Sequence, residues 1–329
     1  MRCSALALMF IFQAGMVQAE EPGHLGIDPE RITVSGMSSG AQMAHQLHLA
    51  YSDIFSGAAL LAGGPYGCAD GSISNALGRC LGKPGTEIPL QELMQSITNA
   101  AENGQIAPLT HLQDDPVWIF HGSLDNAVPL AVNNALVELY GMLLPKDHIT
   151  VVTDIPAAHT FPADGQGSAC DKIETPFVGD CGYDAAGILL QALYPGLTLP
   201  SGQTATSLTE VNLQGADDVL LDESAWLFVP PSCSNANAEC ALHLVLHGCG
   251  QSASQVNQGF MEQSGYLRWA EANNIVLAFP QVVASMANPL ACWDWWGYSD
   301  ENYLWRNGKQ MRVLADWVRS LAHLPQPAP

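Results

Sequence analysis

The sequence predicts an α/β protein with a mostly parallel sheet that helices cover on both faces. Short β-branched segments alternate with longer segments of helical character along the chain, which is the pattern typical of such sheets. The 329 residues are 48% hydrophobic, enough to bury a large core. Neither a Pro/Ser-rich linker nor a repeat of about 20–50 residues interrupts the alternation. We therefore expect a single folded domain.

The expected elements follow this alternation in order. In the first half of the chain we expect strands at 31–35, 56–62, 117–121 and 148–153, and helices at 39–50, 90–102 and 128–143. In the second half we expect strands at 225–229, 242–246 and 275–279, and helices at 262–273 and 310–321. Residues 160–181 combine Gly, Pro and Cys, so we expect a loop there.

The charge balance excludes two classes of partner. Eleven Lys and Arg residues stand against 32 Asp and Glu residues, which gives a net charge of −21 with neutral His. Nucleic acids and anionic membranes both need clustered positive charge on a protein, so we expect neither as a partner. No C-x2-C pair offers a zinc site, and we expect neither a metal nor a cofactor.

The first 19 residues are typical of a secretory signal peptide. Arg2 supplies a positive charge, residues 5–16 form an apolar stretch too short to span a bilayer, and Val17-Gln18-Ala19 offers small residues for cleavage. We therefore expect a mature domain at 20–329, secreted to the cell exterior or the periplasm.

Removal of the signal peptide takes Cys3 with it and leaves eight cysteines in an oxidising compartment, where disulfides persist. Loop closure suggests three close pairs and leaves two cysteines for each other: Cys68–Cys80, Cys170–Cys181, Cys233–Cys240 and Cys249–Cys292. Because eight cysteines allow 105 pairings, the sequence leaves the connectivity open.

The segment Gly36-Met37-Ser38-Ser39-Gly40 is a G-x-S-x-G sequence between an expected strand and an expected helix. That context is what a nucleophile elbow requires, because the glycines permit the tight turn that lifts the serine out of the sheet. The N-terminus of the helix behind the turn favours developing negative charge. Ser38 is therefore the candidate nucleophile.

A nucleophilic serine needs a base and an orienting carboxylate, which in α/β-hydrolases follow it in the order acid, then histidine. Asp125 lies just past the strand at 117–121, and His159 lies in a loop after the strand at 148–153. These two residues are the candidates for acid and base. His45, His48, His121 and His243 lie in expected helices or strands and are expected to be structural.

An oxyanion hole should supply the largest catalytic contribution. One donor is expected from the backbone N–H of Ser39, next to the nucleophile. The second donor normally comes from a loop that precedes the elbow, but little chain precedes it here. A matching loop occurs instead near the other end of the chain, where a strand ends in His247-Gly248-Cys249-Gly250-Gln251.

These motifs together resemble the extracellular poly(3-hydroxybutyrate) depolymerases, specifically the circularly permuted catalytic domain of a single-domain fungal enzyme. The resemblance rests on HGCGQ, GMSSG, HGSLDNAVP, AAHTFP, YDAAG and the CWDWW/YLWRNG region, and covers nearly the whole mature chain. It implies a circularly permuted α/β-hydrolase fold in which the helix ending near Leu321 lies close to Ile27. It also implies a triad of Ser38, Asp125 and His159, with oxyanion N–H groups from Ser39 and Cys249.

The resemblance further implies that Trp305 contacts substrate and that no separate substrate-binding domain is present. Trp293, Trp295, Trp296 and Trp305 fall within thirteen residues, and at least one aromatic side chain of this segment should reach the surface. We expect a monomeric carboxylic ester hydrolase that acts on a neutral polyester or oligoester. The alternatives are a feruloyl or acetyl-xylan esterase, another polyester hydrolase, and an inactive polymer-binding protein.

Overall fold

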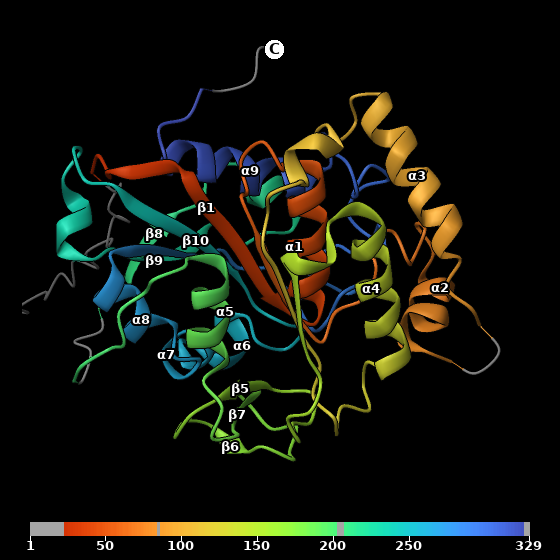
Figure 1. Cartoon of the computed structure of the whole chain (residues 1–329), viewed down its shortest axis with the longest axis horizontal. Coiled ribbons are helices and arrows are strands. Elements are labelled where there is room, and N and C mark those ends of the chain that lie inside the picture. The colour runs from red at the N-terminus through yellow and green to blue at the C-terminus, as the bar shows by residue number, and fades with distance from the viewer. Residues whose placement is uncertain (1–22, 84–85, 203–206, 326–329) are drawn as a thin grey trace, which may run out of the picture.

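The computed structural model describes residues 23–83, 86–202 and 207–325, so the predicted signal peptide lies outside the described residues. An eight-stranded sheet crosses the molecule (Figure 1). Its strands lie in the order β4 (Ile149–Val152), β3 (Val117–Phe120), β2 (Ala58–Leu61), β1 (Ile27–Met37), β10 (Cys240–Leu246), β11 (Ile275–Phe279), β9 (Ser224–Phe228) and β8 (Thr209–Asn212). Pairing is parallel from β4 to β11 and antiparallel for β9 and β8. The expected mostly parallel sheet is confirmed.

Helices cover both faces of the sheet (Figure 1). They are α1 (Ser39–Ala50), α2 (Ile73–Leu77), α3 (Leu90–Glu102), α4 (Leu130–Leu143), α5 (Ala185–Leu193), α6 (Ala253–Val256), α7 (Gly259–Gln263), α8 (Tyr266–Asn273) and α9 (Lys309–Leu321). The buried residues form two large clusters, one with α1, α3, α4 and α9 and the other with α5, α7 and α8. Along β10, Leu242 and Leu244 belong to the first cluster and Ala241 and Val245 to the second, because successive side chains point to opposite faces.

The two ends of the described chain lie side by side, as a circular permutation requires. The rings of His24 and His323 stack with their centroids 3.6 Å apart. Leu25 and Leu321 are buried in the same cluster, against which Ile27 also packs. The first strand, β1, lies in the middle of the sheet and pairs with β10 from the last third of the chain.

Residues 160–181 form more than the expected loop. They contain a three-stranded sheet of β5 (Phe161–Ala163), β7 (Val178–Asp180) and β6 (Ser168–Ala169). These strands are two or three residues long, too short for a hydrophobic alternation to indicate them. The expected helix at 262–273 is also divided, because Gly265 adopts a φ of 90° between α7 and α8.

Four disulfides tie loops to this frame. The structure joins Cys68 to Cys80, Cys170 to Cys181, Cys233 to Cys240 and Cys249 to Cys292. The first three are the close pairs that loop closure suggests, and the fourth joins the two cysteines that those pairs leave over. Within the described ranges, no helix is long and apolar enough to cross a membrane.

Candidate active site

Ser38 stands at a sharp turn between β1 and α1, the nucleophile elbow expected from the sequence. Its φ of 56° and ψ of −116° are strained for a residue with a side chain. The flanking glycines are sterically required. A Cβ on Gly36 would lie 2.1 Å from the Gly40 carbonyl oxygen, and a Cβ on Gly40 would lie 2.3 Å from that of Leu246. Glycine at both positions lets α1 start directly above the strand ends.

A continuous hydrogen-bonded chain joins Ser38 to the two other residues of the predicted triad. His159 Nε2 lies 2.9 Å from Ser38 Oγ, and His159 Nδ1 lies 2.7 Å from Asp125 Oδ2. A carboxylate accepts only, so Nδ1 carries the proton and Nε2 is free to accept the proton of the serine hydroxyl. This is the arrangement that a general base needs.

Asp125 lies in the turn after β3, where its carboxylate is enclosed. Its Oδ1 accepts the backbone N–H groups of Ala127 at 2.8 Å and Val128 at 3.0 Å, while Oδ2 faces His159. Burial alone would raise the pKa of Asp125. The hydrogen bond and charge of His159, together with the two backbone N–H groups, outweigh burial and lower that pKa below its usual value. The carboxyl group is therefore ionised at neutral pH.

The three-stranded sheet fixes the loop that carries His159. The N–H of Ala158 donates to the carbonyl of Cys170 at 2.9 Å, and Cys170 is bonded to Cys181. On the other side, the N–H of Phe161 donates to the carbonyl of Phe177 at 2.9 Å. His159 is thus held on both sides by backbone bonds, although its imidazole stays 17% exposed.

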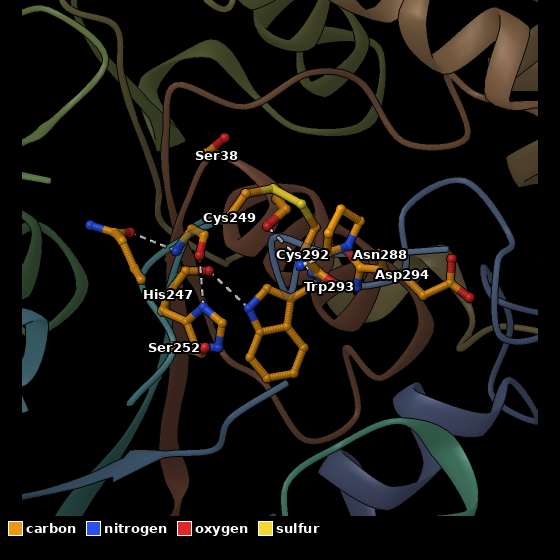
Figure 2. The surroundings of a disulfide bond; sticks show 12 residues. Ser38, His247, Cys249, Ser252, Asn288, Cys292, Trp293 and Asp294 are labelled. Carbon is orange, nitrogen blue, oxygen red and sulfur yellow. Dashed lines mark hydrogen bonds between the residues drawn. A yellow bond between two sulfur atoms is a disulfide. The ribbon is translucent and has the colours of Figure 1, made fainter. Parts of the chain in front are cut away.

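Ser39 and Cys249, which carry the two predicted oxyanion donors, line the same cavity as Ser38. Ser39 is the first residue of α1, and the backbone N–H groups of the first turn of a helix have no acceptor within the helix. The N–H of Cys249 has no acceptor among the described residues either. Cys249, Ser39 and Ser38 all line one cavity. Figure 2 shows Ser38 beside the disulfide of Cys249 and Cys292, which ties the loop to the segment that carries the tryptophans.

The cavity beside Ser38 has a volume of about 250 Å³ and carries no Asp, Glu, Lys or Arg among its lining residues. Its walls are mainly apolar and include Ala62, Ile73, Ala76, Leu77, Leu81, Val128, Leu290, Trp295 and Trp296. Gln42 is the lining amide. Oriented to match its neighbour, it donates to the carbonyl of Gly64 at 3.0 Å and accepts the N–H of Gly64 at 3.3 Å. These two bonds use one N–H and one lone pair of the amide and fix its orientation.

The tryptophans that line the cavity are Trp295 and Trp296, not Trp305. Trp305 is partly buried and packs against the core cluster of α1 and α9. Trp293 is fully buried. The structure therefore does not bring Trp305 to this cavity. The sequence pattern predicted that part of this aromatic cluster would reach the surface, but no local signal distinguished its members.

A buried carboxylate shapes the loop that presents Trp295 and Trp296. Asp294 accepts the N–H groups of Gly297, Tyr298 and Ser299 at 2.7–2.9 Å, and the hydroxyl of Ser299 at 2.6 Å. Burial raises the pKa of Asp294, although these donors oppose the shift. Sequence reasoning did not single out Asp294. An acidic residue followed by a Trp-Trp-Gly turn is the only signal that could have indicated it.

Comparison with known proteins places the chain in a family. The chain is 31% identical to a polyhydroxybutyrate depolymerase of Talaromyces funiculosus, with 96% of each protein covered. The chain belongs to the polyhydroxybutyrate depolymerase family. It is also 39% identical to a poly(3-hydroxybutyrate) depolymerase of Delftia acidovorans over 89% of its own length, but spans only 60% of that protein. No protein-family model matches the chain.

Solved structures of depolymerases share the whole fold. The crystal structure of a PHB depolymerase from Penicillium funiculosum matches with a TM-score of 0.86 at 30% identity, covering 92% of this chain and 99% of the other. A serine-to-alanine PHB depolymerase complexed with an R3HB trimer matches with a TM-score of 0.85 at 29% identity, with the same coverage. These likenesses confirm the α/β-hydrolase fold that the family resemblance implies.

Proposed function

We propose that this chain is a secreted serine esterase that hydrolyses poly(3-hydroxybutyrate) and its oligomers through an acyl-enzyme on Ser38. One observation carries the proposal: the hydrogen-bonded chain Asp125–His159–Ser38 opens on an uncharged, tryptophan-lined cavity. The relatives named for the same polyester support the choice of substrate. Four disulfides suit an oxidising compartment and support secretion.

The first half of the reaction forms the acyl-enzyme. Ser38 Oγ attacks the ester carbonyl while His159 Nε2 takes its proton, and the carboxylate of Asp125 stabilises the resulting imidazolium. The carbonyl oxygen, now negative, accepts the N–H groups of Ser39 and Cys249. Collapse of this intermediate breaks the ester C–O bond, and His159 returns the proton to the departing alkoxide as a hydroxyl end.

The second half repeats these steps with water. His159 takes a proton from the water that attacks the acyl-enzyme, and it returns this proton to Ser38 Oγ as the intermediate collapses and the acyl C–O bond to Ser38 breaks. The product leaves as a carboxylic acid that ionises in solution. Every group used comes from one chain, so the proposal needs no partner subunit, and we infer that the enzyme acts as a monomer.

The cavity supports a polyester over a sugar ester as substrate. A poly(3-hydroxybutyrate) chain offers methyl groups and ester carbonyls, which suit apolar walls. A feruloyl or acetyl sugar would bring several hydroxyl groups that need partners, whereas Gln42 is the one amide that lines this cavity and Gly64 already takes half of its hydrogen-bonding capacity. Ile73, Leu77 and Leu290 line the cavity and are 50–55% exposed, which provides an apolar rim towards solvent.

The test is hydrolysis of amorphous poly(3-hydroxybutyrate), an oligomer ester and a feruloyl sugar ester by wild type, Ser38→Ala and His159→Ala. The matched controls are Ser320→Ala and His111→Ala, which change exposed residues of the same types. We expect both site variants to lose about 10⁴-fold or more in kcat, because the triad acts as a unit. Wild-type turnover in either variant would refute the mechanism. Hydrolysis of the sugar ester but of neither polyester substrate would refute the proposed substrate and identify a sugar ester in its place.

A further inference from the structure

Trp295 and Trp296 form one wall of the cavity beside Ser38 and belong to neither of the two large core clusters. Their rings meet edge to face with centroids 5.4 Å apart. They pack instead against a small buried cluster that contains the disulfide of Cys68 and Cys80. Because both side chains are partly exposed and lie outside the main core, the direction of each ring depends on the loop that carries it.

The backbone of Asp294, which directly precedes the two tryptophans, is bonded to two helices. Its N–H donates to Oε1 of Gln310 in α9 at 3.0 Å, and its carbonyl accepts an amide N–H of Gln46 in α1 at 3.1 Å. Asp294, Gln46 and Gln310 are each at most 2% exposed. Since α1 begins directly after Ser38, these bonds fix the start of the loop relative to the nucleophile.

The carboxylate of Asp294 fixes the other side of the two tryptophans. Its Oδ1 accepts the N–H groups of Gly297 and Tyr298 at 2.7 and 2.9 Å. Its Oδ2 accepts the N–H of Ser299 at 2.9 Å and the hydroxyl of the same residue at 2.6 Å. An ionised carboxylate can accept two donors at each oxygen, as this arrangement requires. The turn that contains the tryptophans is therefore closed from both ends by one residue.

We propose that Asp294 is a positioning residue for substrate selectivity, which holds Trp295 and Trp296 as the wall that an oligoester chain contacts when it is bound at Ser38. Asp294 itself does not line the cavity, so it acts through the two tryptophans. An oligomer of several 3-hydroxybutyrate units reaches this wall, whereas the acetyl group of a small ester does not. The inference rests on the proposed function, because it assumes an oligoester as the substrate.

The alternative is that Asp294 only stabilises the fold. Its replacement leaves buried donors without an acceptor, so some loss of stability is expected in either case. The two roles differ in what else they alter. A general loss of stability lowers the number of active molecules and affects every ester equally, whereas displacement of the wall weakens only the binding of substrates that reach it.

The test compares wild type with Asp294→Asn, Ser299→Ala and a matched control in the same loop. Asn keeps the shape of Asp294, but its NH2 group cannot accept, so two of the four donors lose their partner. Ser299→Ala removes one donor and leaves the carboxylate. The control is Asp300→Asn, because Asp300 accepts the N–H groups of Asn302 and Lys309, which lie beyond the tryptophans.

Selectivity is the ratio of kcat/KM for a soluble 3-hydroxybutyrate trimer to kcat/KM for p-nitrophenyl acetate, with competent sites counted by fluorophosphonate titration. For Asp294→Asn we expect the ratio to fall about tenfold through the KM of the trimer, with kcat on the acetate within about twofold of wild type. Ser299→Ala should lower the ratio about threefold, and Asp300→Asn should leave it within about twofold. Asp294→Asn should add little to the effect of Trp295→Ala, because both changes remove the same contact.

A wild-type selectivity ratio in Asp294→Asn overturns the proposal, whatever happens to its stability. Full additivity of Asp294→Asn and Trp295→Ala also overturns it, because independent effects do not pass through one contact. Should Asp294→Asn yield no competent sites, Ser299→Ala carries the test, and a wild-type ratio in that variant then overturns the proposal. A wild-type protein that hydrolyses p-nitrophenyl acetate but neither the trimer nor the amorphous polymer contradicts the proposed function instead.

Discussion

Acidification should destabilise the fold steeply, because three fully buried histidines resist protonation in the folded state. Burial lowers the pKa of His45 and His243 to about 3 and that of His247 to about 4. In the unfolded chain each returns to about 6.5. Between these values the unfolded state binds more protons than the folded state. Stability is therefore full above about pH 7 and declines as the pH falls through 6.5 towards 4.

The size of the effect follows from the number of protons. Each histidine lowers the free energy of unfolding by about 1.4 kcal/mol for every pH unit below 6.5, which amounts to about 2 kcal/mol at pH 5. The three histidines together lower the free energy of unfolding by about 6 kcal/mol at pH 5. The entire free energy of unfolding of many domains is only about 5–15 kcal/mol. Asp125, whose pKa is lowered from its usual value of 3.8, adds to the loss only near or below that value. Asp294, whose pKa is raised, opposes it.

Denaturant unfolding followed by tryptophan fluorescence, with the disulfides intact, measures this directly between pH 7.5 and 5. The free energy of unfolding should fall with a slope that approaches three protons. His243→Gln should reduce the slope by one proton, whereas His111→Gln, at an exposed position, should leave it unchanged. A wild-type slope of less than one proton would refute the reasoning.

Two further predictions concern the cavity and its disulfide. Trp295→Ala should raise KM for 3-hydroxybutyrate oligomers by about tenfold and that for a small p-nitrophenyl ester by much less, because only the oligomer reaches that wall. An equal selective effect from Trp305→Ala would restore Trp305 as a substrate contact. Joint replacement of Cys249 and Cys292 by Ala should lower the free energy of unfolding by about 2–4 kcal/mol, as the 43-residue separation implies. It should also lower kcat, and full activity in that variant would contradict a positioning role for the disulfide.

Seven of the eight strands of the main sheet could be predicted because their signals are local, whereas the edge strand β8 was not expected. The strand at β1 and the helix at α1 are adjacent segments of opposite character, and the turn between them is marked by two glycines. Asp125 and His159 followed from chain order, since the carboxyl ends of parallel strands meet at one edge of a sheet. The strands β5, β6 and β7 could not be predicted, because backbone pairing across the loop, and no side-chain pattern, defines them.

The residues that line the cavity could not be predicted from the sequence for a related reason. Ile73 and Leu77 of α2 meet Trp295 and Trp296 across more than 200 residues of chain. The short helix α2 lies in the loop between Cys68 and Cys80, a stretch with no clear hydrophobic period. Trp295 and Trp296 line the cavity from a loop that Asp294 shapes through its bonds to Gly297 and Tyr298. The resemblance indicated Trp305 as a substrate contact, whereas the tryptophans that line this cavity are Trp295 and Trp296.

The charge of the molecule affects the second half of the proposed reaction. The ester that enters the cavity is neutral, but each cleavage produces a carboxylate. An ionised carboxylate among apolar walls is costly unless a cation pairs with it, and no Lys or Arg lines this cavity. The net charge of −21 adds a repulsion that is screened beyond about 10 Å in ordinary salt. The same uncharged walls that admit the polyester therefore favour departure of the acid, so accumulating product competes weakly with fresh polymer.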